Sequence, residues 1–187
     1  MQAIAHAPNE LLTAQTKLAL RRLASSVAVV SCRHEGARHA MTATAVNALS
    51  MQPPSMIVCI NNATAFHRAI SSAEKFAINV LHRSHIEISA ECGGKARGED
   101  RFGSGHWSSL ADVPILTDAQ ANIVCSRDTN FDYGSHTIFI GRVTSVDICG
   151  EVDPLIYVDG RYTCLPSDAM PASTVQTEIE ILRQLAM

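Results

Sequence analysis

The chain has few charges, few aromatic residues and no long hydrophobic run. Charged residues make up 18% and aromatic residues 5% of its 187 residues, and the formal net charge at pH 7 is −3. This charge argues against a nucleic-acid partner, because phosphate binding depends on clustered Lys and Arg. No apolar run approaches the ~20 residues that cross a bilayer, and residues 1–10 lack the features of a secretory signal. We therefore expect a cytoplasmic protein with neither a nucleic-acid nor a membrane partner.

The sequence also lacks the common motifs of metal binding and nucleophilic catalysis. Its six cysteines are far apart, with no CxxC pair and no histidine at zinc-ligand spacing. We expect no metal site and interpret the cysteines as small buried hydrophobic residues. A P-loop, a complete GxGxxG fingerprint and a GxSxG elbow are absent, which argues against the corresponding nucleotide folds and serine hydrolases. No side chain is identified as a catalytic acid, base or nucleophile.

What remains is the pattern of one mainly β domain. The length suits a single domain over 1–187, with a core at about 24–165. Strand-like segments with hairpin spacing outnumber helical ones, and no βαβ alternation appears, which favours an antiparallel barrel with peripheral helices. The glycine-rich segment 92–109 is predicted as a loop. The predicted strands are 27–33, 38–46, 56–60, 76–81, 123–128, 136–146, 155–158 and 161–164, and the predicted helices are 9–23, 64–72, 84–91 and 178–185.

The most informative stretch is 41–62, which begins with the small residues Thr42, Ala43, Thr44 and Ala45. Small side chains let a flat ligand lie close to the backbone, while threonine hydroxyls and amide N–H groups supply neutral donors. Donors placed beforehand near a developing charge stabilise it, which suits a planar heterocycle that becomes negative on reduction. The stretch therefore favours a flavin. The alternative is an edge strand whose threonines merely suit β structure.

Five sequence blocks, in this order, resemble the flavin reductase-like family, and most of all the small reductase component of two-component aromatic monooxygenases. The blocks are MTATAV (41–46), QPPSMIVCINN (52–62), FAINVL (76–81), DRF (100–102) and GSHTIFIGRV (134–143). The resemblance implies an FMN-binding split β-barrel, usually homodimeric, with flavin near the subunit interface. It also implies that NADH or NADPH is oxidised while FMN or FAD is reduced, and that the reduced flavin passes to a partner oxygenase.

The resemblance also implies roles for individual residues. Flavin contacts are implied for Thr42, Ala43, Thr44, Ala45, Ser50, Cys59, Ile60, Asn61, Asn62, Thr64, His67, Arg101 and Phe102, and a nicotinamide contact for His136. Two departures from the family pattern leave details open. Ala40 and Thr44 stand where many members have Gly and Asn, which affects hydrogen bonds at the ring edge. Ser135 replaces a frequent Asp, which leaves the orientation of His136 open.

Several of these residues have a second interpretation. Ser50 is equally suited to a turn hydroxyl, and Asn61 and Asn62 could cap the helix that follows them. His67 could be an ordinary surface histidine, and Arg101 could pair with a carboxylate beside it in the sequence.

Three functions are consistent with the sequence. The first is an NAD(P)H:flavin oxidoreductase, in which hydride transfer is cofactor chemistry and the protein supplies proximity and electrostatics. The second is a non-catalytic flavin- or haem-binding split-barrel module. The third is an oxidase that retains its FMN and acts on an amine, which the scarcity of basic residues near the ligand blocks makes less favourable.

Overall fold

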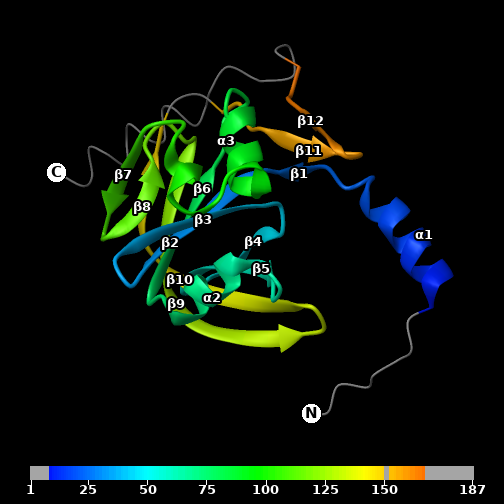
Figure 1. Cartoon of the computed structure of the whole chain (residues 1–187), viewed down its shortest axis with the longest axis horizontal. Helices are drawn as coiled ribbons and strands as arrows, with labels where there is room; N and C mark the ends of the chain where they lie inside the picture. The colour runs from blue at the N-terminus through cyan, green and yellow to red at the C-terminus, as the bar shows by residue number, and fades with distance from the viewer. Residues whose placement is uncertain (1–8, 150–151, 167–187) are drawn as a thin grey trace.

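The centre of the fold is a seven-stranded antiparallel sheet, seen in a computed structural model that describes residues 9–149 and 152–166 (Figure 1). Its strands run in the spatial order β3-β2-β6-β9-β10-β5-β4. They are β2 (Ala28–His34), β3 (Ala37–Ala43), β4 (Val46–Met51), β5 (Pro54–Asn61), β6 (Lys75–Val80), β9 (Ala121–Tyr133) and β10 (His136–Ile148). The predicted helix at 178–185 lies outside the described residues.

The two edge strands of this sheet, β3 and β4, are consecutive in the chain. Only Thr44 and Ala45 connect them, so the sheet must curl until its two edges meet at that link. The result is a barrel that is split between β3 and β4, as predicted. The expectation of one strand over 38–46 is wrong at its end, because the chain leaves β3 after Ala43 and begins the other edge at Val46.

The hydrophobic core fills the inside of this curled sheet. Alternating inward residues of the strands, among them Val30, Val58 and Phe139, are fully buried, as the two-residue period of a strand requires. Helix α2 (Ala65–Ser72) closes the core by burying Phe66, Ala69 and Ile70, three positions on one helical face. Packing against the core therefore fixes the position of α2 beside the end of β5.

The segment that follows β6 begins along the outer edge of β3, where η1 and η2 lie, and ends in a hairpin that packs against β2 and β6. It consists of α3 (Ile86–Ala90), a π-helical turn η1 (Glu91–Lys95), a 3₁₀ turn η2 (Gly98–Phe102), and the hairpin of β7 (Trp107–Leu110) and β8 (Val113–Leu116). The expectation of an uninterrupted loop over 92–109 is therefore wrong. Hydrogen bonds hold the segment to β3: the Thr42 hydroxyl donates to the Ser89 carbonyl oxygen at 2.7 Å, and Arg101 donates to that of Ala40.

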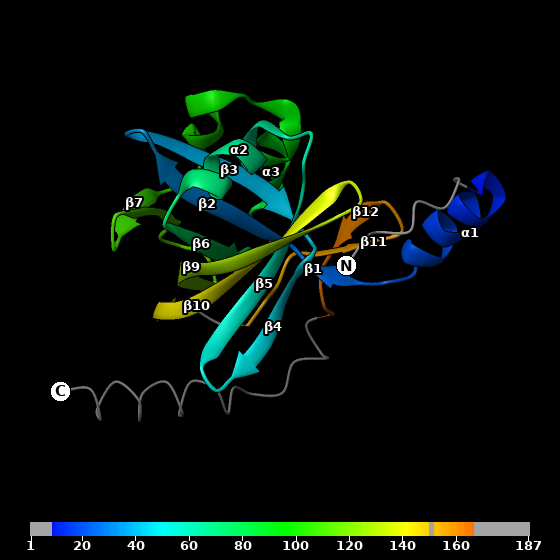
Figure 2. The same ribbon diagram turned by 90° about the horizontal axis from the view of Figure 1, so that it is seen from below.

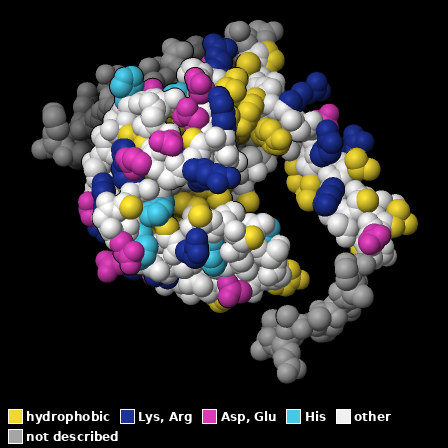
Figure 3. All heavy atoms as spheres, in the orientation of Figure 1, with side chains coloured by type: hydrophobic (Ala, Val, Ile, Leu, Met, Phe, Trp, Pro, Cys, Tyr) yellow, Lys and Arg dark blue, Asp and Glu magenta, His cyan; other side chains and the backbone are white. Residues whose placement is uncertain are grey.

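Helix α1 (Glu10–Leu20) projects from the body in both ribbon views (Figures 1 and 2). Asn9 caps it as predicted, its side chain accepting the N–H of Leu12 at 3.1 Å. None of its residues is buried, and Figure 3 shows hydrophobic side chains exposed along it beside Lys and Arg.

A small sheet lies beside the base of α1. It is formed by β1 (Ser25–Ser26), β11 (Ile156–Val158) and β12 (Arg161–Thr163). Arg21 pairs with Asp159 in the β11–β12 turn at 3.0 Å, which fastens the end of α1 to this sheet. Among the helices of the described residues, none is both long and apolar enough to traverse a bilayer.

Candidate functional site

The small-residue strip predicted from the sequence lies where the barrel is split. Thr44 and Ala45 are exposed, and the Ala45 carbonyl oxygen accepts the N–H of Cys59 at 3.0 Å. The strip is therefore held against the end of β5. Because β3 and β4 are the edges of the sheet, their outer backbone groups have no strand partner within the described part of the chain. At the link between these edges the exposed backbone of Thr44 and Ala45 lies beside small side chains, which fits a flat, hydrogen-bonding ring.

The turn between β5 and α2 is held by its own hydrogen bonds and lies next to this strip. The Thr64 hydroxyl accepts the N–H of His67 at 3.2 Å and donates to the Asn61 carbonyl oxygen at 2.8 Å. The Asn61 side chain accepts the N–H of Ala63 at 2.9 Å. Thr64, rather than Asn61 or Asn62, therefore caps α2. The turn brings Cys59–Thr64 and the strip 42–45 to one side of the split.

His136 lies beside the same turn. It begins β10 and is paired with Asn61 of β5 on one side and with Tyr133 of β9 on the other. Its ring is exposed, and Nδ1 lies 2.9 Å from the Ser135 hydroxyl. The Ser135 hydroxyl thus contacts the imidazole where the sequence resemblance led us to expect an Asp carboxylate. The strand register places His136 within reach of a ligand that contacts the Asn61 turn.

A basic pocket of about 420 Å³ adjoins the first turn of α2. We define it by its lining residues, which are Arg38, His39, Ala40, Ala65, Phe66, Arg97, Gly98 and Arg101. Arg38 is neutralised by Glu99, whose carboxylate accepts its Nε–H at 2.9 Å. Arg97 and Arg101 have no carboxylate partner among the described residues. The pocket therefore combines two uncompensated guanidinium groups with a helix N-terminus, which together favour a phosphate group.

Arg101 holds the wall of the basic pocket in place. Its Nε–H donates to the Ala96 carbonyl oxygen at 3.1 Å, and its Nη1 donates to that of Ala40 in β3. It pairs with neither neighbouring carboxylate, so the alternative of a local ion pair is wrong. The pKa of His39 lies below its ordinary value, mainly because the ring is partly buried and also because the charge of His34 is nearby. The positive charge of the pocket at neutral pH therefore comes from its arginines.

Three of the residues assigned from the resemblance lie differently. Ser50 is near the far end of β4, opposite Ser55, roughly 16 Å along the strand from Ala45 at ~3.3 Å per residue. Its hydroxyl accepts the N–H of Gln52 at 2.9 Å, which matches its alternative role in a turn. Ile60 is fully buried, so only its backbone can contact a ligand.

Phe102 is part of the core rather than of an open site. It is 8% exposed, its ring lies edge-on to Trp107 with centroids 4.8 Å apart, and the Arg38 guanidinium lies 4.2 Å from its centroid. The ring thus supports one wall of the basic pocket from behind.

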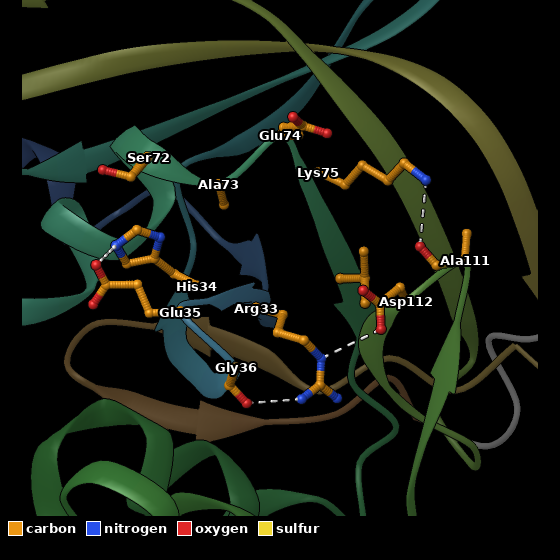
Figure 4. Close-up of a pocket in the computed structure, with 11 residues that line it drawn as sticks. Arg33, His34, Glu35, Gly36, Ser72, Ala73, Glu74, Lys75, Ala111 and Asp112 are labelled. Atoms are coloured by element: carbon orange, nitrogen blue, oxygen red, sulfur yellow. Dashed lines mark hydrogen bonds and ion pairs between the residues drawn. The ribbon is translucent and has the colours of Figure 1, made fainter.

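A second cavity, of about 330 Å³, contains none of the predicted site residues (Figure 4). It lies between the β2–β3 turn, the start of β6 and the β7–β8 turn. Arg33 faces Asp112 at 3.5 Å, and Lys75 lies 3.5 Å from the Ala111 carbonyl oxygen (Figure 4). Positive and negative side chains alternate around it, so it lacks the excess positive charge of the basic pocket.

The buried cysteines take no part in either cavity. Cys32, Cys92 and Cys125 are fully buried, and burial raises the pKa of each thiol to about 12. They therefore stay protonated and unreactive at neutral pH. This confirms, for these three, the interpretation as small hydrophobic residues.

Sequence reasoning missed Arg38, His39 and Arg97 as members of the site. Arg38 and Arg97 lie 59 positions apart and meet only because η2 lies along β3. The available signal was their position just before the MTATAV and DRF blocks, which is too weak to separate them from ordinary surface charges.

Comparison with known proteins decides the family. A model described as "Flavin reductase like domain" matches residues 20–166. The chain belongs to the flavin reductase-like family. It is 39% identical over 153 residues to the reductase component of an FADH2-dependent resorcinol hydroxylase of Rhizobium sp., covering 80% of this chain and 85% of that protein.

The chain is also similar to other members of the flavin reductase-like family. The chain is 34% identical over 149 residues to the FMN reductase (NADH) RutF of Methylorubrum extorquens, covering 79% and 73% of the two chains. The solved flavin reductase PheA2 superposes with a TM-score of 0.75 at 28% identity, covering 86% of this chain and all of that one. The expected family and split-barrel fold are thereby confirmed.

Proposed function

We propose that this protein is an NADH-dependent flavin reductase that reduces FMN or FAD and supplies the reduced flavin to a separate oxygenase. The observation that carries the proposal is the meeting of three features at the split: the small-residue strip 42–45, the Asn61–Thr64 turn and His136. The names of the relatives support the same function, since they include a hydroxylase reductase component and an FMN reductase (NADH). A reaction that consumes NADH also fits a cytoplasmic location.

In this proposal, the residues at the split bind and orient the two substrates. The strip 42–45, with its exposed backbone at Thr44 and Ala45, contacts the flavin ring, and the basic pocket holds its phosphate through Arg97, Arg101 and the first turn of α2. His136, oriented by Ser135, contacts the nicotinamide. A flavin held there would supply the redox chemistry. The protein contributes proximity, which can be worth roughly 7–11 kcal/mol at best, and donors beside the developing charge.

A simple assay distinguishes the three functions. NADH oxidation is followed at 340 nm with increasing free FMN, FAD or riboflavin. Turnover that rises with free flavin and saturates supports the reductase. A protein that binds flavin or haem but is inert to NADH is instead a non-catalytic module. An enzyme that retains FMN and oxidises an amine with oxygen, without consuming NADH, supports the third function.

We also propose that the protein is a homodimer. Helix α1 buries none of its residues and exposes Leu11, Leu12, Leu18 and Leu20, and the β9–β10 hairpin exposes Phe131 and Tyr133 at its tip. Exposed apolar side chains of this number are typical of an interaction surface. Light scattering coupled to size-exclusion chromatography should give twice the 20.1 kDa chain mass. A monomer at micromolar concentration would contradict the proposal.

A further inference from the structure

The Thr137 hydroxyl is the centre of a hydrogen-bond network that nothing in the family resemblance identifies. Thr137 is 1% exposed and lies on β10, directly after His136. Its Oγ1 lies 2.6 Å from Oδ1 of Asp132, 2.8 Å from Nε2 of His67 and 3.0 Å from Oδ1 of Asn62. A buried hydroxyl with three such contacts has all of its hydrogen-bonding capacity in use.

The single proton of this hydroxyl fixes the direction of every bond. A threonine hydroxyl donates once and accepts twice, and an ionised carboxylate only accepts. Thr137 therefore donates to Asp132, the shortest contact. The other two partners must donate to Oγ1: His67 does so from a protonated Nε2. Asn62 does so with its side-chain amide turned, so that the nitrogen takes the place assigned to Oδ1; the two amide positions are exchangeable.

The network joins the four elements that meet at the split. Asp132 comes from β9, Thr137 from β10, His67 from α2, and Asn62 from the turn after β5. The backbone N–H of Asn62 also donates to the Ser135 carbonyl oxygen at 3.0 Å. The turn on the flavin side of the proposed site and the strand that carries the nicotinamide-side histidine are thus fastened to each other within a few ångströms.

We propose that Thr137 is a positioning residue that sets the geometry between the bound flavin and the nicotinamide. This inference rests on the proposed reductase function. Thr137 acts through Asn62 and His67 on one side and through its neighbour His136 on the other. Hydride transfer depends steeply on the distance and alignment of the two rings, so a small displacement of the turn relative to β10 slows the reaction.

The activity test compares two substitutions of Thr137 with a control on the same strand. Thr137→Val keeps the shape and removes the hydroxyl, and Thr137→Ser restores it. Thr144→Val removes a hydroxyl that donates to the Val124 carbonyl oxygen, away from the site. We expect Thr137→Val to lower kcat/KM for NADH by about tenfold to a hundredfold. Thr137→Ser and Thr144→Val should stay within about twofold. All variants are assayed well below their melting temperatures.

A merely structural role for Thr137 predicts a different result. In that case Thr137→Val would lower the melting temperature and leave kcat and KM of the folded protein unchanged. That outcome, or equal loss of activity in Thr137→Ser and Thr137→Val, would overturn the proposal.

A second measurement does not depend on turnover. Long-range ¹H–¹⁵N correlation spectra at pH 8 report the tautomer of each imidazole, and His67→Gln identifies the signals of His67. The network requires the proton on Nε2 in the wild-type protein and a changed pattern in Thr137→Val. A proton on Nδ1 in the wild type would refute the network. If the wild type reduced no free flavin, the proposed function would fail, whereas these spectra would still decide the hydrogen bonding.

Discussion

The placement of the flavin phosphate in the basic pocket can be tested by removing one charge. Arg97 is exposed at the mouth of the pocket and has no carboxylate or carbonyl partner among the described residues. Arg97→Gln therefore removes a positive charge without breaking a side-chain hydrogen bond or ion pair within the described part of the chain. Arg101→Gln removes a half-buried charge and also frees the carbonyl groups of Ala96 and Ala40. The first variant is the cleaner test, and the second should show the larger effect.

The expected losses of FMN affinity follow from how exposed each arginine is to solvent. An exposed charge contributes about 1 kcal/mol to phosphate binding, because solvent screens it, and a half-buried charge-assisted hydrogen bond contributes about 2 kcal/mol. The dissociation constant for FMN should therefore rise about fivefold in Arg97→Gln and about thirtyfold in Arg101→Gln. Riboflavin carries the same ring and ribityl chain without the phosphate. Its affinity should change less than about twofold in Arg97→Gln, because only the phosphate contact is lost.

Titration by quenching of flavin fluorescence measures these constants. Arg68→Gln is the matched control, since Arg68 is exposed on α2, carries the same charge and does not line the basic pocket. An equal loss of FMN and riboflavin affinity in Arg97→Gln would refute the phosphate assignment. An equally large effect of Arg68→Gln would show that net charge, not the pocket, is responsible.

Three further predictions concern separate parts of the molecule. Gly141→Ala should lower the free energy of unfolding by about 1–3 kcal/mol in urea titration, because a Cβ there would lie 2.5 Å from the Phe76 ring. Ser135→Ala should raise the KM for NADH severalfold in steady-state assays and leave flavin affinity unchanged, because the hydroxyl orients only His136. Burial lowers the pKa of His85, so the unfolded chain takes up a proton near pH 6.5 that the folded protein does not. Wild-type stability should therefore fall more steeply than that of His85→Gln as the pH drops below about 6.5.

The local features of this protein are determined by neighbouring residues, and they could be predicted from the sequence. The α1 cap at Asn9, the helix over 65–72 and most strands depend on short-range periodicity and capping. The small-residue strip and the ordered blocks likewise indicated the flavin reductase-like family, which the match over 20–166 confirms. The wide spacing of the cysteines predicted a structural role, and the burial of Cys32, Cys92 and Cys125 confirms it.

Other features depend on contacts between distant segments. The break at Thr44 is invisible in a continuous run of small residues, because only the curling of the sheet makes Ala43 and Val46 belong to opposite edges. The extended course of β4 likewise carries Ser50 away from the other predicted flavin residues, although it is close to them in sequence.

Sequence by itself therefore determined the family, the strand-rich architecture and the small, neutral character of the split. Tertiary structure alone decided which charges act together. Arg38, Arg97 and Arg101 form one pocket because η2 lies along β3. Thr137 meets Asp132, Asn62 and His67 because β9, β10, α2 and the turn after β5 converge. The physical reason is the same in both cases: hydrogen bonds and charges act over a few ångströms, and only the packed fold brings residues so far apart in the chain within that distance.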